Sequence, residues 1–596
     1  MKAIELEVAN FRSYKRAKVS LGSGLKTIVG ENNVGKSSLL AALQAIRVAG
    51  GIGPEDWPFG NSDGPMSLRL ELNLGEPEIK RFCKELEIPD RDSSYLGTEL
   101  TIKIDWERQG AQVLPYATLG PLRIFSNGTA SLESQDPMMG YMPILWNEVL
   151  RVSKGSTGSI WEAAKSKMKD YSKNSPGINI RLEFPKNAFT TIITILQERI
   201  VIFPEFRQRP LGGAPTEDVQ SPEGTQIPAV LFNLKNSVKK AQRKRFDEIQ
   251  RFFTGLFPTL QLEVVKGPHV LIERTGTGSE IPLARIGAGI AQMITLLTHL
   301  VGSEDMIFVL DGPELHLHPH SQRLLRKVLE GSTQNQVVVV THSPEFINFS
   351  EPNGILLVRQ VEGQSQVIQL PNDYLRDKEK AGMSKMVWSE DKDFLFSRRV
   401  LLVEGPTEYA AMPILADRLG LNLDENAVSV VEVGGDYFGL FLKLLKGFGL
   451  PFLVMCDKDA LMNIGKGKIE TRTKKIRTSP LFYAIWRAGL LSDDDVAQLI
   501  KVERNITTTQ ANGKNVVRYD ERESSLLESS VNKYGFRILS PNFEGFLLRK
   551  GFRNLLRNAG RNYHKDKILQ GRYVAMKMEN IPKELKEIIA EVSSLK

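Results

Sequence analysis

Two short acidic motifs each follow an apolar run that is typical of a buried strand. Glu404 and Glu408 follow the first run, and Asp457 and Asp459 follow the second. In an open α/β sheet the carboxyl ends of the strands form the edge where ligands bind, so we expect the four carboxylates to converge there. Like charges at close range repel unless a cation neutralises them, and oxygen ligands without His or Cys favour Mg²⁺ or Mn²⁺. The motifs therefore predict a divalent-metal site of the kind that acts on phosphodiester bonds.

A phosphate-binding motif lies near the N-terminus. Residues 30–37 fit G-x-x-x-x-G-K-S, with a strand pattern before them and an amphipathic helix pattern after them. Backbone N–H groups of such a loop surround phosphates at a helix N-terminus. We expect Lys36 to contact the β- and γ-phosphates of ATP and the Ser37 hydroxyl to ligate Mg²⁺. The nucleotide-binding candidates of the loop are Gly30, Asn33, Gly35, Lys36, Ser37 and Ser38.

Three later segments carry further residues suited to a nucleotide site. Asp311 ends an apolar strand pattern and is expected to bind Mg²⁺ through water. His342 follows the next strand pattern, where it could hydrogen-bond to a γ-phosphate. Gly287 and Gly289 open a helix whose N-terminus could cap a γ-phosphate. With Glu314, these residues complete the predicted nucleotide site.

The combination of these motifs resembles the SMC-like ABC ATPases. The resemblance rests on the phosphate loop, the Gly-x-Gly helix start, Asp-Gly-Pro-Glu-Leu-His-Leu-His-Pro at 311–319 and Thr-His-Ser-Pro at 341–344. In ABC-type ATPases the glycine-led helix acts in trans, so the resemblance implies a composite site that forms when two nucleotide domains sandwich ATP.

The C-terminal acidic motifs resemble the Toprim domain of topoisomerases, primases and certain nucleases. The resemblance rests on Glu-Gly-x-Thr-Glu at 404–408 followed by Asp-x-Asp at 457–459. An SMC-like ATPase followed by Toprim resembles the overcoming-lysogenization-defect (OLD) family of nucleases, which includes the nuclease subunit of Gabija anti-phage systems. It implies ATP binding, a homodimer or higher homo-oligomer, and metal-dependent cleavage of double-stranded DNA. A helicase-like protein, or a reverse transcriptase with its DNA product, accompanies related proteins.

The same resemblance gives roles to residues beyond the two motifs. Glu544, after another strand pattern, matches an additional acid that OLD-type Toprim domains use for a second metal. The family also places a lysine near the C-terminus to stabilise transition-state charge, and Lys567 is preferred over Lys565. The predicted catalytic set is Glu404, Glu408, Asp457, Asp459, Glu544 and Lys567. Its acids are the predicted metal ligands, together with Ser37 and Asp311 at the nucleotide.

One position departs from the family pattern. The family usually has Asp-Glu-Pro-Glu after the second nucleotide-site strand, and its first Glu polarises the attacking water. Here Gly312 follows Asp311, and Glu314 stands two residues further on behind Pro313, which restricts the backbone. We therefore expect ATP to bind normally and to be hydrolysed slowly, while a role for Glu314 as the replacement base stays open.

A basic run and a histidine cluster each allow two interpretations. The run follows Asp459, has only Glu470 as an opposing acid, and either forms a solvated face or contacts DNA phosphates. It comprises Lys466, Lys468, Arg472, Lys474, Lys475 and Arg477. His316, His318 and His320 suggest a zinc site or, as the family resemblance favours, a dimer interface.

Composition excludes several classes of protein. The chain has 596 residues, 41% of them apolar and 25% charged, which is ordinary for a soluble protein of three or four domains. The net charge of +8 permits a polyanionic partner. Only Cys83 and Cys456 are present, so no disulfide framework or thiolate zinc site is expected. Without a membrane-spanning apolar run or signal peptide, we expect a cytoplasmic protein.

The expected fold class is α/β: an ABC-type ATPase domain with a helical insertion, followed by a Toprim domain built on a parallel sheet with flanking helices. The expected domain boundaries follow the motifs. Residues 1–135 and 259–375 form the two parts of the ATPase, 136–258 a helical insertion that could serve as a dimerisation region, 376–398 a linker, and 399–596 the Toprim domain with a helical insert and C-terminal helices.

Three other functions remain to be compared with an ATP-regulated DNA endonuclease. An SMC-like DNA-binding clamp or DNA repair protein would have a weak or inert Toprim site, against which the complete acid set argues. A topoisomerase needs a domain with a nucleophilic Tyr, for which the two assigned halves leave no room. A primase needs a template-binding zinc module, which two Cys cannot supply.

Overall fold

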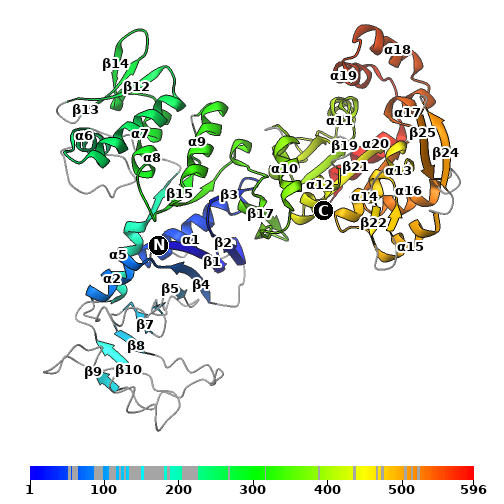
Figure 1. Ribbon diagram of the computed structural model, residues 1–596. Helices are drawn as coiled ribbons and strands as arrows, with labels where there is room; N and C mark the ends of the chain where they lie inside the picture. Colours follow the sequence, from blue (N-terminus) through cyan, green and yellow to red (C-terminus); the bar gives the residue numbers. More distant parts are fainter. Residues whose placement is uncertain are drawn as a thin grey trace. The chain divides into compact units, whose positions relative to one another are not determined.

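The structure is a computed structural model in which two compact units are described separately (Figure 1). Unit 1 comprises Met1–Ile347 and Asn353–Gln369, and unit 2 comprises Asn348–Pro352 and Leu370–Lys596. The residues that the structure describes are 1–50, 56, 65–85, 98–106, 116–119, 122–126, 129–132, 150–152, 180–183, 188–204, 226–265, 269–315, 317–386, 390–433, 438–464, 468–470, 475–502, 506–511, 514–519 and 524–595.

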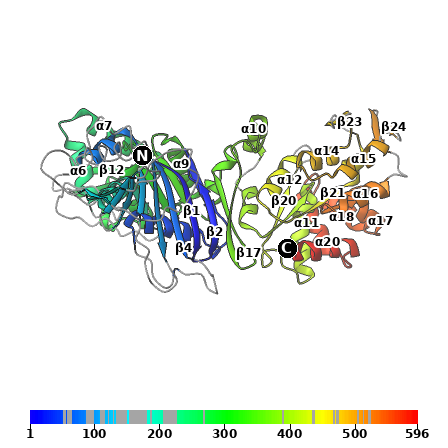
Figure 2. The same ribbon diagram turned by 90° about the horizontal axis from the view of Figure 1, so that it is seen from below.

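The first layer of unit 1 is a sheet of mostly antiparallel strands. Figure 2 shows three of them, β1, β2 and β4, running side by side. Along β1 and β4, buried residues alternate with more exposed ones, as expected for strands with one face on a core. In spatial order the strands are β2 (Tyr14–Ser20), β1 (Lys2–Phe11), β4 (Met66–Asn73), β5 (Glu99–Trp106), β6 (Tyr116–Leu119), β7 (Leu122–Phe125), β8 (Thr129–Leu132), β10 (Ile180–Glu183) and β9 (Leu150–Val152).

The second layer of unit 1 is a six-stranded sheet that carries the nucleotide motifs. Its strands are parallel except for the last, which pairs antiparallel to its neighbour. In spatial order they are β11 (Ile200–Phe203), β15 (Ile307–Asp311), β16 (Gln336–Val340), β3 (Leu25–Val29), β17 (Ile355–Val361) and β18 (Gln364–Gln369). The central strands are continuous apolar runs and are buried, as expected for parallel strands covered on both faces.

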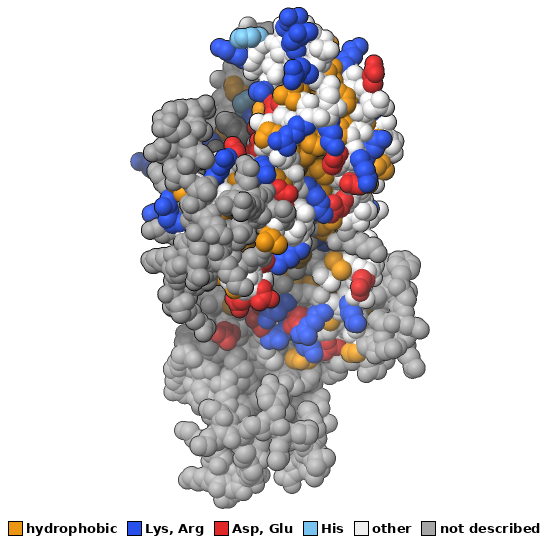
Figure 3. All heavy atoms as spheres, turned by 90° about the vertical axis from the view of Figure 1, so that its right-hand side faces the viewer, with side chains coloured by type: hydrophobic (Ala, Val, Ile, Leu, Met, Phe, Trp, Pro, Cys, Tyr) orange, Lys and Arg blue, Asp and Glu red, His pale blue; other side chains and the backbone are white. Residues whose placement is uncertain are grey.

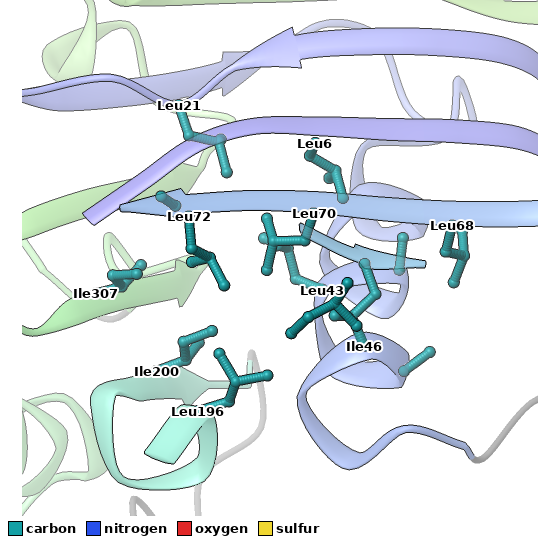
Figure 4. Close-up of a cluster of buried hydrophobic side chains, with 14 of the residues drawn as sticks. Leu6, Leu21, Leu43, Ile46, Leu68, Leu70, Leu72, Leu196, Ile200 and Ile307 are labelled. Atoms are coloured by element: carbon teal, nitrogen blue, oxygen red, sulfur yellow. The ribbon is translucent and has the colours of Figure 1, made fainter. Parts of the chain in front are cut away.

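Helices α1 (Lys36–Val48) and α5 (Ala188–Arg199) join these two layers. Figure 4 shows Leu70 and Leu72 of β4, Leu43 of α1, Leu196 of α5 and Ile307 of β15 pointing into one apolar cluster. Each such side chain stabilises the fold by about 1.5–3 kcal/mol on burial. The phosphate-loop helix is therefore fixed between the layers by its own apolar face. A further helix of this region is α2 (Glu76–Glu85).

A second apolar cluster of unit 1 lies around a helical subdomain. Its helices are α6 (Ile227–Asn236), α7 (Lys240–Leu256), α8 (Ala288–Leu300) and α9 (Pro319–Gly331), and its three-stranded sheet is β12 (Leu260–Val265), β13 (His269–Arg274) and β14 (Ser279–Pro282). Short 3₁₀ helices are η3 (Leu283–Arg285), η4 (Pro344–Phe346) and η5 (Pro352–Gly354).

The expectation of a purely helical insertion over 136–258 is wrong in two respects. Strand β11 lies inside that range, yet it pairs with β15 as the edge of the parallel sheet. The helical stretch is also interrupted between α6 and α7, where Val238 is 93% exposed. The apolar face of α7, including Phe246 and Phe253, is buried within unit 1 itself. It is therefore not a free apolar face for dimerisation.

Unit 2 is built on a four-stranded parallel sheet. In spatial order its strands are β20 (Val428–Glu432), β19 (Arg399–Val403), β21 (Phe452–Asp457) and β26 (Phe536–Leu539). Two hairpins accompany it: β22 (Lys468–Glu470) with β23 (Lys475–Arg477), and β24 (Ile506–Ala511) with β25 (Lys514–Tyr519). The helices are α10 (Asp377–Met386), η6 (Glu390–Phe396), α11 (Pro406–Arg418), α12 (Phe438–Gly447), α13 (Lys458–Met462), α14 (Pro480–Arg487), α15 (Asp493–Val502), α16 (Ser524–Asn532), α17 (Phe543–Arg549), α18 (Arg553–Asn562), α19 (Lys567–Lys577) and α20 (Lys583–Ser594).

The described parts of the expected linker, 376–386 and 390–398, are packed into unit 2. Glu379 on α10 is buried and forms ion pairs with Arg376, Lys443 and Arg487. Phe394 is fully buried and stacks on Phe349. The charged composition that suggested a solvated linker instead supplies an ion-pair cluster that holds α10 to α12 and α14. No helix among the described residues is both long and apolar enough to cross a membrane.

Candidate active site and nucleotide site

Adjacent parallel strands bring the two acidic motifs together in unit 2. Strands β19 and β21 run parallel, and Val403 lies opposite Met455, so both strands end at the same edge of the sheet. The backbone N–H of Asp457 donates to Glu404 Oε2 at 2.9 Å. Asp459 lies in the first turn of α13 and is exposed.

Glu408 reaches this edge from the first turn of α11. The helix begins with Pro406, whose fixed φ suits a first helical position and whose missing N–H is not needed there. Glu408 is buried, and its Oε2 would lie 2.9 Å from a Cβ added to Gly405. A larger residue at 405 would therefore displace the Glu408 carboxylate.

Glu544 and Lys567 form a direct ion pair beside the motifs. Glu544 lies in the first turn of α17, after β26, and Lys567 begins α19. The Lys567 Nζ is 2.7 Å from Glu544 Oε1, to which the Thr407 hydroxyl also donates at 3.3 Å. The arrangement joins Glu544 to the Glu-Gly-x-Thr-Glu segment through Thr407, which sequence reasoning did not single out.

A close helix contact positions Lys567. Gly571, one turn further along α19, approaches α11 so closely that an added Cβ would lie 2.3 Å from the Thr407 carbonyl oxygen. Only glycine permits this approach. Sequence reasoning missed Gly571, although a glycine within a helix-forming segment was a signal, because it usually destabilises a helix interior unless close packing requires it.

The phosphate loop of unit 1 is buttressed by backbone and hydroxyl groups. The Tyr14 hydroxyl donates to the Gly35 carbonyl at 3.0 Å, and the Ser365 hydroxyl donates to the Val34 carbonyl at 2.5 Å. Gly35 has φ 102 and caps α1, and a Cβ there would lie 2.5 Å from Ser13 Oγ. The glycines of the motif are therefore required by both backbone conformation and space.

Lys36 is folded onto the loop that it is expected to serve. It is buried, and its Nζ donates to the Gly30 carbonyl at 2.9 Å and to the Glu31 carbonyl. Burial lowers its pKa to about 8, and the nearby charges of Asp311, Glu31 and Glu314 oppose that shift. Ser37 is exposed at the start of α1, and Ser38 is half-buried.

The later nucleotide-site residues meet around the ends of β15 and β16. Asp311 ends β15 opposite Val340. Glu314 is buried, and its Oε1 accepts the backbone N–H of His342 at 2.8 Å. Both carboxylates act electrostatically on Lys36. Glu314 is thus part of the nucleotide site, although it is fixed to the loop that follows β16.

The remaining nucleotide candidates begin α8. Gly287 is its N-cap residue, exposed, with no atom within 4 Å of an added Cβ, and Gly289 is buried in the first turn. The helix begins at Ala288 rather than Ile290. An open helix N-terminus of this kind is suited to a phosphate.

Family models match both halves of the chain. The model described as "Overcoming lysogenization defect protein-like, TOPRIM domain" matches residues 395–459. The model described as "AAA ATPase domain" matches residues 1–106 and 151–347, more than half of the chain. The chain belongs to the AAA ATPase-domain family and carries an OLD-like Toprim domain. The expected fold class, an α/β ATPase followed by a Toprim domain, is confirmed.

Individual proteins are similar to large parts of this chain. The OLD nuclease of Thermus scotoductus is 22% identical over 494 residues, covering 79% of this chain and 84% of that protein. Endonuclease GajA of Bacillus cereus is 22% identical over 484 residues, covering 78% of this chain and 76% of that protein. The uncharacterized protein MJ1542 of Methanocaldococcus jannaschii is 26% identical over 263 residues, 42% of this chain, and the match spans only 32% of that relative.

Among solved structures, an SMC head bound to the C-terminal winged-helix domain of ScpA is similar to part of this chain. It is 13% identical, covers 63% of this chain and 99% of that chain, and gives a TM-score of 0.36, which adds nothing to the fold assignment.

The acids at this edge of the Toprim sheet have shifted pKa values. Burial, with the charges of Asp457, Glu544 and Glu404, raises the pKa of Glu408 to about 7. Burial and the charges of Glu404 and Glu544 raise the pKa of Asp457 to about 7. Burial also raises the pKa of Glu404. Burial acts in the same direction on Glu544, but hydrogen bonds, chiefly from Lys567, outweigh it and lower its pKa. Of these four acids, Glu544 is the one whose charge is offset by a lysine, so the negative charge of the other three is unbalanced among the described residues.

A divalent cation fits this deficit. Asp457 Oδ1 is buried and has no hydrogen-bond partner in the described part of the chain, as expected for an atom that is free to ligate. The donors are carboxylate oxygens, which suit Mg²⁺ or Mn²⁺. As the side chains stand, no three His, Cys, Asp or Glu residues among those described are grouped closely enough to hold an ion. Binding would therefore require the carboxylates to rotate toward it.

The backbone conformation of Gly312 is relevant to the absence of a glutamate after Asp311. Gly312 has φ 55, in the left-handed region that favours glycine. Its N–H donates to the Val340 carbonyl at 2.9 Å. A glutamate at this position would adopt an unfavourable backbone conformation, at about 1–2 kcal/mol.

Several predicted residues lie outside the described part of the chain. Of the basic run, Lys466, Lys468, Arg472, Lys474 and Lys475 have no described side chain, whereas Arg477 is exposed at the end of β23. His316 is also outside it. His318 caps α9 and His320 lies in its first turn, both exposed.

Proposed function

We propose that this protein is a divalent-metal-dependent DNA endonuclease whose Toprim site is regulated by ATP bound in unit 1. The observation that carries the proposal is the sheet edge where Glu404, Asp457 and Glu408 adjoin the Glu544–Lys567 pair. An isolated acid at a strand end does not by itself indicate a catalytic site. Several buried acids with raised pKa values beside one lysine suit a phosphodiester and its counter-ions.

The surroundings of each residue indicate its role in cleavage. We assign Glu404, Asp457 and Asp459 to one Mg²⁺ or Mn²⁺, and Glu408 and Glu544 to a second. When bound, such ions polarise the phosphate and stabilise charge on the attacking and leaving oxygens.

Lys567 stands where it can pair with a phosphate oxygen in place of Glu544 Oε1.

ATP would act through Lys36, Ser37 and Asp311. Nucleotide phosphates would replace the loop carbonyls as partners of Lys36, with Mg²⁺ held by Ser37 and, through water, by Asp311. Because Gly312 supplies no carboxylate, turnover would be slow and bound ATP would act as an occupancy signal. A ligand of this kind shifts the nuclease between states only by its differential affinity for them.

The assembly we propose is a homodimer or higher homo-oligomer in the cytoplasm. The open N-terminus of α8 at Gly287 would complete the nucleotide site of a second copy. The nuclease names of two relatives support DNA as the substrate, which we propose is double-stranded. Anti-phage defence, with a helicase-like or reverse-transcriptase partner, is the role that the family resemblance of the sequence motifs implies.

A plasmid assay tests this function. Supercoiled DNA is incubated with the protein and Mg²⁺, Mn²⁺ or EDTA, and we expect nicked or linear products only with metal. Glu404→Gln should abolish them, whereas Glu425→Gln, at an exposed acid of the same unit, should not. Relaxed topoisomers would indicate a topoisomerase. ATP-dependent DNA binding without cleavage would indicate an SMC-like clamp with an inert Toprim site.

A further inference from the structure

One segment of unit 2 carries all of the net charge of the chain. Residues 549–577 contain nine of the 78 Lys and Arg residues and one of the 70 Asp and Glu residues, Asp566. The segment therefore has eight excess positive charges, and the rest of the chain has none. Figure 3 shows Lys and Arg side chains gathered at the upper end of this face of the molecule, where α18 lies in Figure 1.

Helix α18 presents this charge as a regular row. Its sequence, Arg-Asn-Leu-Leu-Arg-Asn-Ala-Gly-Arg-Asn, repeats Arg-Asn every four residues. The row comprises Arg553, Arg557 and Arg561, each followed by an exposed Asn, and all three arginines are exposed. The opposite face packs inward through Leu555, Leu556 and Ala559. Residues four apart lie on one side of a helix, so the arginines follow one another about 6 Å apart.

The row is not balanced by acids on its own helix. An ordinary solvated helix face pairs its cations with acids four residues away, as Lys583 pairs with Glu587 on α20. Helix α18 contains no acid. Within the described part of the chain, Arg553, Arg557 and Arg561 form no ion pair or side-chain hydrogen bond. These charges are therefore available to an external anion.

The chain connects this row directly to the acidic site. Glu544 begins α17, which precedes α18, and Lys567 begins α19, which follows it. Because Lys567 and Glu544 are in contact at 2.7 Å, the turn that leaves α18, Tyr563 to Asp566, ends at the edge of the site. Asp566 itself caps α19 by accepting the Leu569 N–H at 3.0 Å.

We propose that the Arg-Asn row of α18 is a docking surface for the sugar-phosphate backbone of duplex DNA, which it directs into the acidic site. The proposal rests on the proposed nuclease function and names where its substrate binds. The row spans about 12 Å, a length over which one DNA strand presents three or four phosphates. Arginine supplies the charge and asparagine supplies neutral hydrogen-bond donors, both common phosphate partners. Arg and Asn side chains also contact base edges in other complexes, so the test measures the salt dependence of binding, which reports phosphate contacts.

The test is the salt dependence of binding to a duplex oligonucleotide in EDTA, where cleavage cannot occur. In the full chain, we expect the triple variant Arg553→Gln, Arg557→Gln and Arg561→Gln to have a shallower slope of log K, the association constant for DNA, against log salt. The magnitude of the slope should fall by about 2.7, or 0.9 for each lost contact. Between 50 and 200 mM salt the unmodified protein should then lose about 40-fold more affinity than the variant. Replacing the same three arginines with lysine should restore the slope, which a role in packing would not predict.

The matched control neutralises three exposed lysines of α7 or its N-cap: Lys239, Lys240 and Lys244. The docking surface would be refuted by an unchanged slope in the arginine variant or by an equal decrease in slope in the α7 control. Preference of the unmodified protein for duplex RNA over DNA would also refute it. If the slope is unchanged while the unmodified protein cleaves plasmid, the surface is wrong and the nuclease function stands. If the slope falls while the unmodified protein never cleaves, the surface stands and the nuclease function fails.

Discussion

Replacing Glu408 with Gln should stabilise the metal-free protein while abolishing its activity. Glu408 is buried beside Asp457, Glu544 and Glu404, and these surroundings raise its pKa to about 7 from an ordinary value of 4.5. Its ionised form is therefore unfavourable in the folded state. Glutamine keeps the shape of the side chain and removes the charge, so it relieves the repulsion without opening a cavity.

The size of the effect follows from the shift in pKa. An acid whose pKa is raised in the folded state favours folding most below its unfolded pKa, near 4.5, where it is protonated in both states. This stability is lost as the pH rises to about 7, because the unfolded chain ionises more readily than the folded one. The shift corresponds to about 3 kcal/mol. In EDTA at pH 8, Glu408→Gln should therefore be more stable than the unmodified protein by about 3 kcal/mol, and the difference should shrink toward pH 4.5.

Differential scanning calorimetry of the full chain measures this difference. For a unit of this size, about 3 kcal/mol corresponds to about 6–12 °C in the transition of unit 2. Adding Mg²⁺ at pH 8 should raise the transition of the unmodified protein more than that of the variant, because the variant lacks one ligand of the second ion while the first site keeps its ligands. A variant that is less stable than the unmodified protein in EDTA at pH 8 would refute the argument that unbalanced carboxylates strain this edge. Equal Mg²⁺ stabilisation of both proteins would refute the assignment of Glu408 as a ligand.

Three further predictions concern the positioning and regulation of the site. Gly571→Ala should destabilise unit 2 by about 1–3 kcal/mol and reduce cleavage, because its Cβ meets the Thr407 carbonyl; Gly560→Ala on the open side of α18 is the control, and equal cleavage by both variants would contradict the close-contact role. ATP turnover should be well below the common enzyme value of about 10 s⁻¹. Glu314→Gln should change this turnover by no more than about threefold, since the amide oxygen can still accept the backbone N–H of His342. A loss of about 100-fold in a turnover assay would instead identify Glu314 as the base. Hydrogen bonds from three cations outweigh burial and lower the pKa of Glu379 to about 2, so the stability that Glu379 contributes is present above pH 4.5 and is lost as the pH falls through about 2. Urea unfolding should show Glu379→Gln to be less stable than the unmodified protein by about 3 kcal/mol at pH 7. A difference in unfolding free energy that does not narrow by pH 3 would count against this ion-pair cluster.

Local sequence determined the features that depend on contiguous residues. The phosphate loop could be identified because its glycines, Lys36 and the following helix are set by the backbone over a few positions. The strands before Glu404 and Asp457 are short apolar runs, and such runs at the carboxyl edge of a parallel sheet allow few other arrangements. The family resemblance, and with it the fold class, followed from these local motifs.

Tertiary structure decided the features that join distant segments. Only folding brings Lys567 to Glu544, and only the close approach of two helices explains why position 571 is glycine. Strand β11 was missed because four apolar residues within a charged, helix-rich stretch gain their strand conformation from pairing with β15. Residues 376–398 were expected to be solvated because their charges could not be matched in sequence to the distant cations that bury Glu379. Composition and local pattern specify which groups are present, whereas pKa values, ion pairs and helix contacts depend on distances that exist only in the folded chain.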